Sequence, residues 1–213
     1  MNYDSFLELV KSRRSIRKFK PDPIPDSAID KIIETARYAP SGANTQPWEF
    51  LVIKKQELKD GIMQIINEMR PSHSSSDTSK APVFIMLLGD ERARTGLPGK
   101  AGQDDRKWQS VLTSSLASAF LYMHLAAASL GLASQWQSGV ERPDARQKLA
   151  KLLGLPDELH IYDMMVVGYP DAPPAPKLLR ERLEMVHYDY CRKEDIRTEE
   201  DIREFFTRSR NPK

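Results

Sequence analysis

WQSVLTSSLASAFLYMHLAAASLGLASQWQSGV, residues 108–140, decides the fold because it carries no full charge. His124 is its only side chain that titrates near neutral pH. The stretch exceeds the roughly 18 apolar residues at which a membrane span is considered. It is, however, rich in Ser, Thr and Ala, and it has neither an aromatic belt at both ends nor a second span. Small residues let a helix approach its neighbours closely. We therefore expect a central helix that is buried on all sides and ends near Gly131, with no membrane association.

Apolar patterns on both sides of this stretch predict alternating helices and strands. Helical spacing marks four further segments, the first capped by Asp4: 4–10, 26–36, 58–69 and 145–153. Short apolar runs predict buried strands at 50–53, 83–88 and 164–167. The remaining segments predict loops at 72–79, 90–107 and 131–139, an extended proline-rich run at 170–176, and a charged helical tail from 178. The polar loop at 90–107 is a candidate lid or gate over a ligand site.

Composition narrows the class of protein without giving its function. A chain of 213 residues is predicted to form one domain, with no linker and no repeat. A single cysteine, Cys191, excludes an internal disulfide. The net charge of +2 is too balanced for a surface built to hold nucleic acid or anionic lipid. The N-terminal residues lack a long apolar segment typical of a signal peptide, so a cytoplasmic protein is expected.

Several common catalytic signatures are missing from the sequence. No G-x-G-x-x-G follows a predicted strand, and Gly99-Lys100 lacks the earlier glycine of a P-loop. The four histidines are scattered without H-E-x-x-H, so no metal site is predicted. Ser15-Ile16-Arg17-Lys18 matches S-x-x-K, but the S-D-N and K-T-G motifs that accompany it are absent.

The strongest concentration of cations is RRSIRKF at residues 13–19. Guanidinium groups bind phosphate oxygens in a bidentate manner, and a serine hydroxyl can complete the set of donors. A solvated end of the first helix would explain the same charges, because cations there offset the helix dipole. Nucleic acid is a weaker alternative, because the cluster is short. A phosphate-bearing small ligand is the preferred interpretation.

Three further segments carry side chains suited to binding, although each is weak by itself. PSGANTQPW at 40–48 predicts an irregular loop with exposed amides, in which Asn44 and Gln46 could read a ring edge, or else an ordinary turn before a core Trp48. GLASQWQSG at 131–139 places Trp136 among amide side chains after the central helix. PKLLR at 176–180 adds two cations after the proline-rich run.

Together, the order and spacing of these motifs resemble the nitroreductase family of FMN-dependent oxidoreductases. The resemblance runs from about Val10 to His187 and rests mainly on the motifs at 13–17 and 40–48. It implies an α+β fold with a mainly antiparallel sheet flanked by helices, in an intertwined homodimer with two FMN sites at the subunit interface. The single domain would then span residues 1–213, with a core of about 10–187 and a charged tail at 188–213.

The resemblance also implies a role for each motif. Arg13, Arg14 and Ser15 would bind the FMN phosphate and ribityl chain, and Arg17 would lie near flavin N1 and the C2 carbonyl. Pro40, Ser41 and Gly42 of the partner subunit would lie along the isoalloxazine, with Asn44 nearby. The environment of flavin N5 would comprise Gln137, Ser138 and Gly139. A second pair of cations on the phosphate would be Lys177 and Arg180. No side chain need be catalytic, because the flavin carries the electrons.

The implied activity is reduction of a nitroaromatic, a quinone or a related acceptor by NAD(P)H, with a ping-pong mechanism. The alternative is a flavin-binding protein that receives electrons from a redox-protein partner, or a specialised flavin-modifying or dehalogenating member. Dehalogenating relatives share Pro-Ser-Gly-Ala but supply a Glu, a Tyr and a Lys from a lid. The corresponding stretch here, 63–80, is short, Ser-rich and without Tyr, which argues against deiodination.

Overall fold

The computed structural model describes residues 2–69, 78–140, 142–174 and 177–210, and the chain divides into two compact units. The first unit comprises residues 1–173, and the second comprises residues 174–213. The first unit holds the sheet, five helices and the first three sequence motifs. A single domain with a tail from 188 stays a prediction.

One four-stranded antiparallel sheet forms the centre of the first unit, in the order β1-β2-β4-β3. Its strands are β1 (Trp48–Ile53), β2 (Val83–Asp90), β3 (Ala133–Gln137) and β4 (Leu159–Gly168). The two central strands are almost wholly buried, as the apolar runs at 83–88 and 164–167 predict, but β4 begins five residues before its run, at Leu159. β1 lies at an edge, so its middle residues are only partly buried, whereas the sequence predicts a buried strand.

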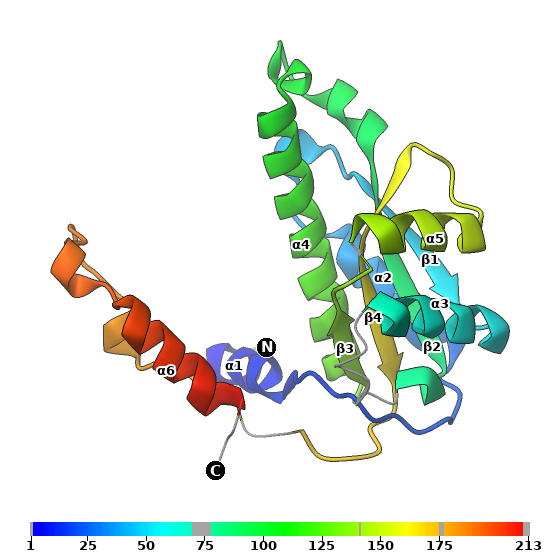
Figure 1. The fold of residues 1–213 in the computed structure, drawn as a ribbon, viewed down its shortest axis with the longest axis horizontal. Helices are drawn as coiled ribbons and strands as arrows, with labels where there is room; N and C mark the ends of the chain where they lie inside the picture. Colours follow the sequence, from blue (N-terminus) through cyan, green and yellow to red (C-terminus); the bar gives the residue numbers. More distant parts are fainter. Residues whose placement is uncertain (1, 70–77, 141, 175–176, 211–213) are drawn as a thin grey trace. The chain divides into compact units, whose positions relative to one another are not determined.

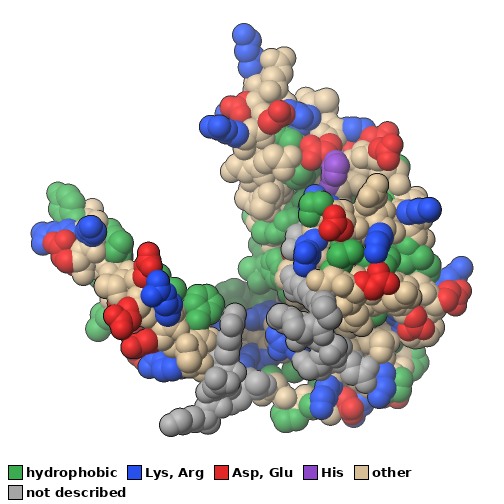
Figure 2. Space-filling view, viewed as in Figure 1, with side chains coloured by type: hydrophobic (Ala, Val, Ile, Leu, Met, Phe, Trp, Pro, Cys, Tyr) green, Lys and Arg blue, Asp and Glu red, His purple; other side chains and the backbone are tan. Residues whose placement is uncertain are grey.

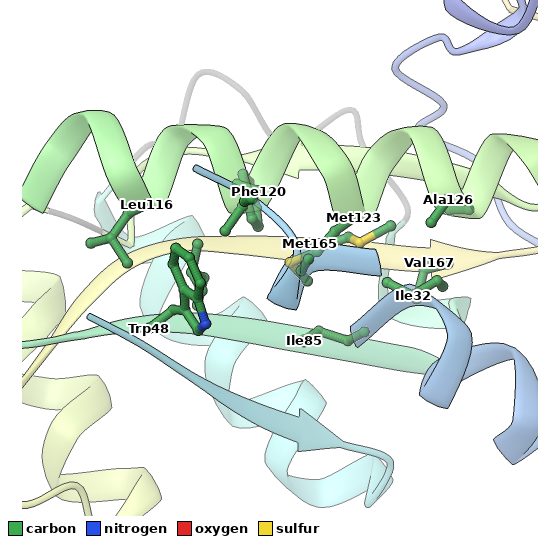
Figure 3. Close-up of a cluster of buried hydrophobic side chains, with 14 of the residues drawn as sticks. Ile32, Trp48, Ile85, Leu116, Phe120, Met123, Ala126, Met165 and Val167 are labelled. Carbon is green, nitrogen blue, oxygen red and sulfur yellow. The ribbon is translucent and has the colours of Figure 1, made fainter. Parts of the chain in front are cut away.

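Helices cover both faces of this sheet, and each face has its own apolar core (Figure 1). On one face α2 (Asp26–Arg37) packs on α4 (Asp105–Ser129). There Phe120, Met123 and Ala126 of α4 point toward Met165 and Val167 of β4 (Figure 3). On the other face α3 (Gln56–Met69) packs on α5 (Pro143–Leu153). The predicted α+β fold class is confirmed.

The long helix α4 is only half enclosed by its own chain. By length and composition it could cross a membrane, yet half of its most apolar window is buried. Its outer face leaves Leu121 45% exposed, and hydrophobic side chains reach the surface along it (Figure 2). The expectation of burial on all sides is therefore wrong for a single chain. No described element of the first unit covers that face completely.

The structure corrects three predictions in the first unit: the cap of the first helix and two segments predicted as loops. Helix α1 (Tyr3–Ser12) is capped by Asn2, whose side chain accepts the amide of Ser5 at 2.9 Å, and not by Asp4. The predicted loop at 131–139 contains β3, which pairs with β4. The polar side chains of β3 can be buried because they form hydrogen bonds, such as that from Gln135 to Gln137. The segment 90–107 is not an open loop. It holds two 3-10 turns, η4 (Glu91–Gly96) and η5 (Ala101–Gln103), before Asp104 caps α4.

The second unit is less helical than the sequence predicts. It contains η6 (Arg182–Glu184), η7 (Lys193–Asp195) and α6 (Glu199–Arg210), so the helix begins at 199 and not at 178. Asp189 has a φ of +61°, which interrupts helical geometry. Thr198 then accepts the amide of Asp201 at 3.2 Å and fixes the start of α6.

Candidate flavin site

The cation motif at 13–17 lies against the edge strand β3. Helix α1 ends at Ser12 with Arg13 as its C-cap, and the extended chain that follows donates from the amide of Ile16 to the carbonyl of Ser134 at 3.1 Å. Ser15 and Ser134 form a parallel bridge, so the chain runs toward Arg17 in the direction in which β3 runs toward Gln137. Phe19, almost fully buried, then pairs with Pro170 and anchors the far end. The edge of the sheet therefore carries the cations.

Exposure differs along this cation motif. Arg13 and Arg14 are partly buried, whereas Ser15 and Arg17 are exposed and Ile16 is buried between them. Buried Ile16 and Phe19 thus fix the backbone, whereas the polar side chains between them and before them reach the surface at least in part. This alternation suits a segment that binds an anion, because the residues that anchor the segment to the sheet differ from those whose side chains would contact the anion.

Beneath the cation motif lies a cluster of polar and aromatic side chains from α4, β3 and β4. His124 of α4 lies 2.7 Å from the Ser134 hydroxyl through Nδ1 and stacks on Trp136 with ring centroids 5.6 Å apart. Phe120 packs edge-on against both rings. Trp136 donates from Nε1 to the carboxylate of Asp163 on β4 at 2.5 Å. The cluster fixes the side-chain geometry of β3 from below.

The imidazole of His124 is neutral in this environment. Burial lowers its pKa from 6.5 to about 3, and the positive charge of Arg13 contributes in the same direction. Its Nε2 is buried and has no hydrogen-bond partner in the described ranges 2–69, 78–140, 142–174 and 177–210. A neutral ring adds no repulsion to the cations above it.

The predicted N5 environment comprises the last residue of β3 and the two residues that follow it. Gln137 is buried and accepts from the side-chain amide of Gln135 at 3.0 Å. Ser138 is exposed, and Gly139 has a φ of +124°, a conformation that only glycine adopts without strain. The backbone therefore turns sharply where the resemblance places the amide facing the flavin.

The loop at 40–46 is strained and packs on α4. Three of its residues other than glycine have positive φ: Ala43 at 51°, Asn44 at 54° and Gln46 at 43°. Such conformations cost on the order of 1 kcal/mol or more each and cluster at ligand-binding sites. Gln46 donates its amide to the Ser41 hydroxyl at 3.1 Å, and its side chain donates to Asn44 at 3.1 Å. These bonds hold the strained shape.

The position of this loop on α4 is set by Gly42. Its amide lies 3.3 Å from the Ser115 hydroxyl, and a Cβ added there would lie 2.6 Å from Val111. His124, beneath the cation motif, is nine residues farther along the same helix than Ser115. At 1.5 Å per residue the two contact points are about 13 Å apart along the helix axis. Gly42 thus holds the loop that contains Pro40, Ser41 and Asn44 at a different part of α4 from His124.

The segment 91–103 lies beside that loop and is tied to α4. Arg94 donates to the carbonyl of Gly102 at 2.7 Å and pairs with Asp105 at 2.7 Å. A Cβ on Gly96 would lie in ordinary contact with Thr45 at 3.5 Å. The predicted lid is therefore an ordered wall beside the 40–46 loop, and its role as a gate stays a prediction.

Lys177 and Arg180 belong to the second unit. Arg180 there donates to the carbonyl of Glu184 at 2.5 Å. Their assignment to the phosphate stays a prediction. His124, Ser134 and Asp163 are the site residues that sequence reasoning missed. The one signal available was that His124 is the only group titrating near neutrality within an uncharged stretch.

Comparisons with known proteins decide the family. The model of the nitroreductase family matches residues 10–169, three quarters of the chain. The chain belongs to the nitroreductase family. The match includes the motifs at 13–17, 40–48 and 131–139 and ends before Lys177 and Arg180.

Two curated relatives and one solved structure illustrate the family. A Methanothermobacter thermautotrophicus protein, provisionally named NADH dehydrogenase/NAD(P)H nitroreductase, is 31% identical over 79% of this chain and 79% of its own. The iodotyrosine deiodinase of Drosophila melanogaster is 32% identical over 83% of this chain and 66% of its own. An FMN-dependent nitroreductase of Clostridium difficile superposes with a TM-score of 0.69 and 25% identity, over 87% of this chain and 99% of its own. The chain is thus an oxidoreductase of the nitroreductase family.

Proposed function

We propose that this chain is an FMN-dependent NAD(P)H oxidoreductase that reduces a nitroaromatic, a quinone or a related small acceptor. The observation that carries the proposal is the docking of the motif at 13–17 onto Ser134, from which Arg17 follows in the direction in which β3 runs toward the Gln137–Gly139 turn. The family match and the FMN-dependent neighbour point in the same direction.

The residues at the β3 edge fit the chemistry of an FMN phosphate. Two guanidinium groups, Arg13 and Arg14, and the hydroxyl of Ser15 supply donors to a dianion, on a backbone that Ile16 anchors. The imidazole of His124 beneath them is neutral and adds no repulsion to the two guanidinium groups. When bound, FMN would supply hydride-accepting and hydride-donating chemistry, so no side chain is assigned as nucleophile or general base.

The active form is proposed to be a homodimer in which each 40–46 loop serves the partner's site. In one chain this loop contacts α4 at Ser115, about 13 Å along the helix axis from His124, which lies beneath the cation motif. The incompletely covered outer face of α4 offers apolar surface for a second copy. A monomer would then hold only part of the site.

Nucleotide and acceptor are proposed to use one site in turn. The chain has no dinucleotide fingerprint and thus no separate nucleotide-binding motif. Shared occupancy gives ping-pong kinetics, with parallel lines in double-reciprocal plots and mutual competition at high concentration.

The test is anaerobic reduction of the purified protein by NADH and by NADPH, followed by reoxidation with nitroaromatics and quinones in turn. Intersecting double-reciprocal lines, or a stable complex of oxidised protein with both substrates, would contradict the shared site.

Reductive deiodination is a second candidate, favoured by the named deiodinase relative. Against it stands the absence of Tyr from residues 63–80, most of whose second half (70–77) lies outside the described residues. Iodotyrosine is therefore one acceptor in the panel. Iodide release at a rate comparable to nitroaromatic reduction would favour this second candidate.

A further inference from the structure

His124 is an unexpected residue for its position in the core. It lies on the most apolar helix of the chain, is 2% exposed, and faces β3 between Phe120 and Trp136. Leucine or methionine would fill such a position without the cost of burying a polar ring. A buried histidine therefore needs a reason that packing alone does not supply.

The hydrogen bond to Ser134 supplies that reason. Nδ1 of His124 lies 2.7 Å from the Ser134 hydroxyl, and the carbonyl of the same serine accepts the Ile16 amide at 3.1 Å. One residue of the edge strand therefore connects the imidazole below with the cation motif above. The stack on Trp136, nearly parallel at 5°, holds the plane of the ring in which Nδ1 reaches Ser134.

The electrostatic setting of His124 is consistent with this connection. Burial lowers the pKa of the imidazole, and the charge of Arg13 lowers this pKa further. Among the groups that face the ring, Ser134, Trp136 and Phe120 are uncharged, and the Asp163 carboxylate is occupied by Trp136. The ring stays neutral through the physiological range and can keep one hydrogen-bonding arrangement with Ser134.

We infer that His124 is a positioning residue, which through Ser134 holds the Arg13–Ser15 segment in the geometry that binds a phosphate monoester. It is not a catalytic residue, because its ring lies beneath the strand and its Nε2 is inaccessible to a ligand. The inference rests on the proposed function, since the phosphate in question is that of FMN. The inference adds a determinant of phosphate binding that lies outside the cation motif itself.

The experiment compares two ligands that differ only in the phosphate, FMN and riboflavin, by fluorescence titration of the apoprotein. His124→Phe keeps the ring and removes the hydrogen bond, and Ser134→Ala removes the same bond from the other side with little loss of volume. Each is expected to weaken FMN binding roughly 5- to 10-fold, as for a lost hydrogen bond, while changing riboflavin binding less than about 2-fold. His124→Asn, whose amide can reach Ser134, is expected to restore part of the preference for FMN.

The matched control is Met123→Leu, which alters a buried neighbour on the same helix whose thioether donates no hydrogen bond to Ser134 or to the cation motif. It should leave the ratio of FMN to riboflavin affinity unchanged, even if it lowers the melting temperature. The double variant His124→Phe/Ser134→Ala should lose no more than either single variant, because both remove one interaction.

Two results would overturn the inference. A ratio of FMN to riboflavin affinity that stays at the wild-type value in His124→Phe and Ser134→Ala would show that the pair does not position the phosphate ligands. Parallel weakening of both ligands would assign His124 a general structural role. Failure of the wild-type protein to bind either flavin would instead contradict the proposed function, so the two failures are distinguishable.

Discussion

Arg13 is the C-cap of α1 and begins the extended segment that docks on β3. Arg13→Ala is therefore expected to weaken FMN binding by about 1.5–3 kcal/mol, the usual contribution of a hydrogen bond to a charged group. Fluorescence titration measures the loss. Lys31→Ala, which removes an exposed cation on α2, is the control and should bind FMN as the wild type does. An equal loss in both variants would assign the effect to net charge.

His124 makes the free energy of unfolding decrease as the pH falls. Burial lowers its pKa from the ordinary value of 6.5 to about 3 in the folded protein, so the unfolded chain binds the proton more readily. The contribution of the neutral His124 ring to the free energy of unfolding is complete above pH 6.5. It is lost as the pH falls toward 3, by about 1.4 kcal/mol per pH unit. Chemical denaturation at several pH values should show this slope in the wild type and a slope shallower by about one proton in His124→Phe. Identical slopes would mean that the buried ring titrates normally.

At the scale of elements, Gly42 determines how the strained loop packs on α4. A Cβ there would meet the stiff, β-branched Val111 at 2.6 Å, so Gly42→Ala is expected to destabilise the fold by about 1–3 kcal/mol. Val111→Ala should recover most of that loss in the double variant, because it removes the colliding atoms. Gly96→Ala, whose Cβ would make only ordinary contact, is the control in the same denaturation experiments. Equal effects of Gly42→Ala in both backgrounds would rule out this contact as the cause.

Elements also show where sequence reasoning succeeded and where it did not. Helices α2, α3 and α5 follow the spacing of their isoleucines and leucines, and β2 and the second half of β4 follow unbroken apolar runs. β3 was missed because Ser134, Gln135 and Gln137 are buried through hydrogen bonds, which no hydrophobicity pattern reveals. The fixed wall at 91–103 was missed because Arg94 ties it by contacts with Gly102 and Asp105. The cation motif could be predicted from its residues, whereas its support from His124 required the fold.

At the scale of the whole molecule, apolar surface is left without cover in the single chain. Helix α1 contains no buried residue and leaves Tyr3 73% exposed, and α4 exposes Leu121. Burying such surface contributes about 25 cal/mol per Å², which favours association of two copies. Multi-angle light scattering is expected to give about twice the 24.3 kDa chain mass. A monodisperse monomer that carries FMN would contradict the proposed exchange of 40–46 loops.

The central claim is that the cation motif on the β3 edge holds an FMN phosphate, and the flavin content of the purified protein tests it most directly. The protein is denatured after reconstitution with excess FMN and removal of the free flavin, and the released flavin is identified by chromatography and quantified by absorbance. The account predicts a yellow protein that releases FMN, and not FAD or riboflavin, at close to one equivalent per chain. A folded but colourless protein that cannot be reconstituted with FMN would contradict it.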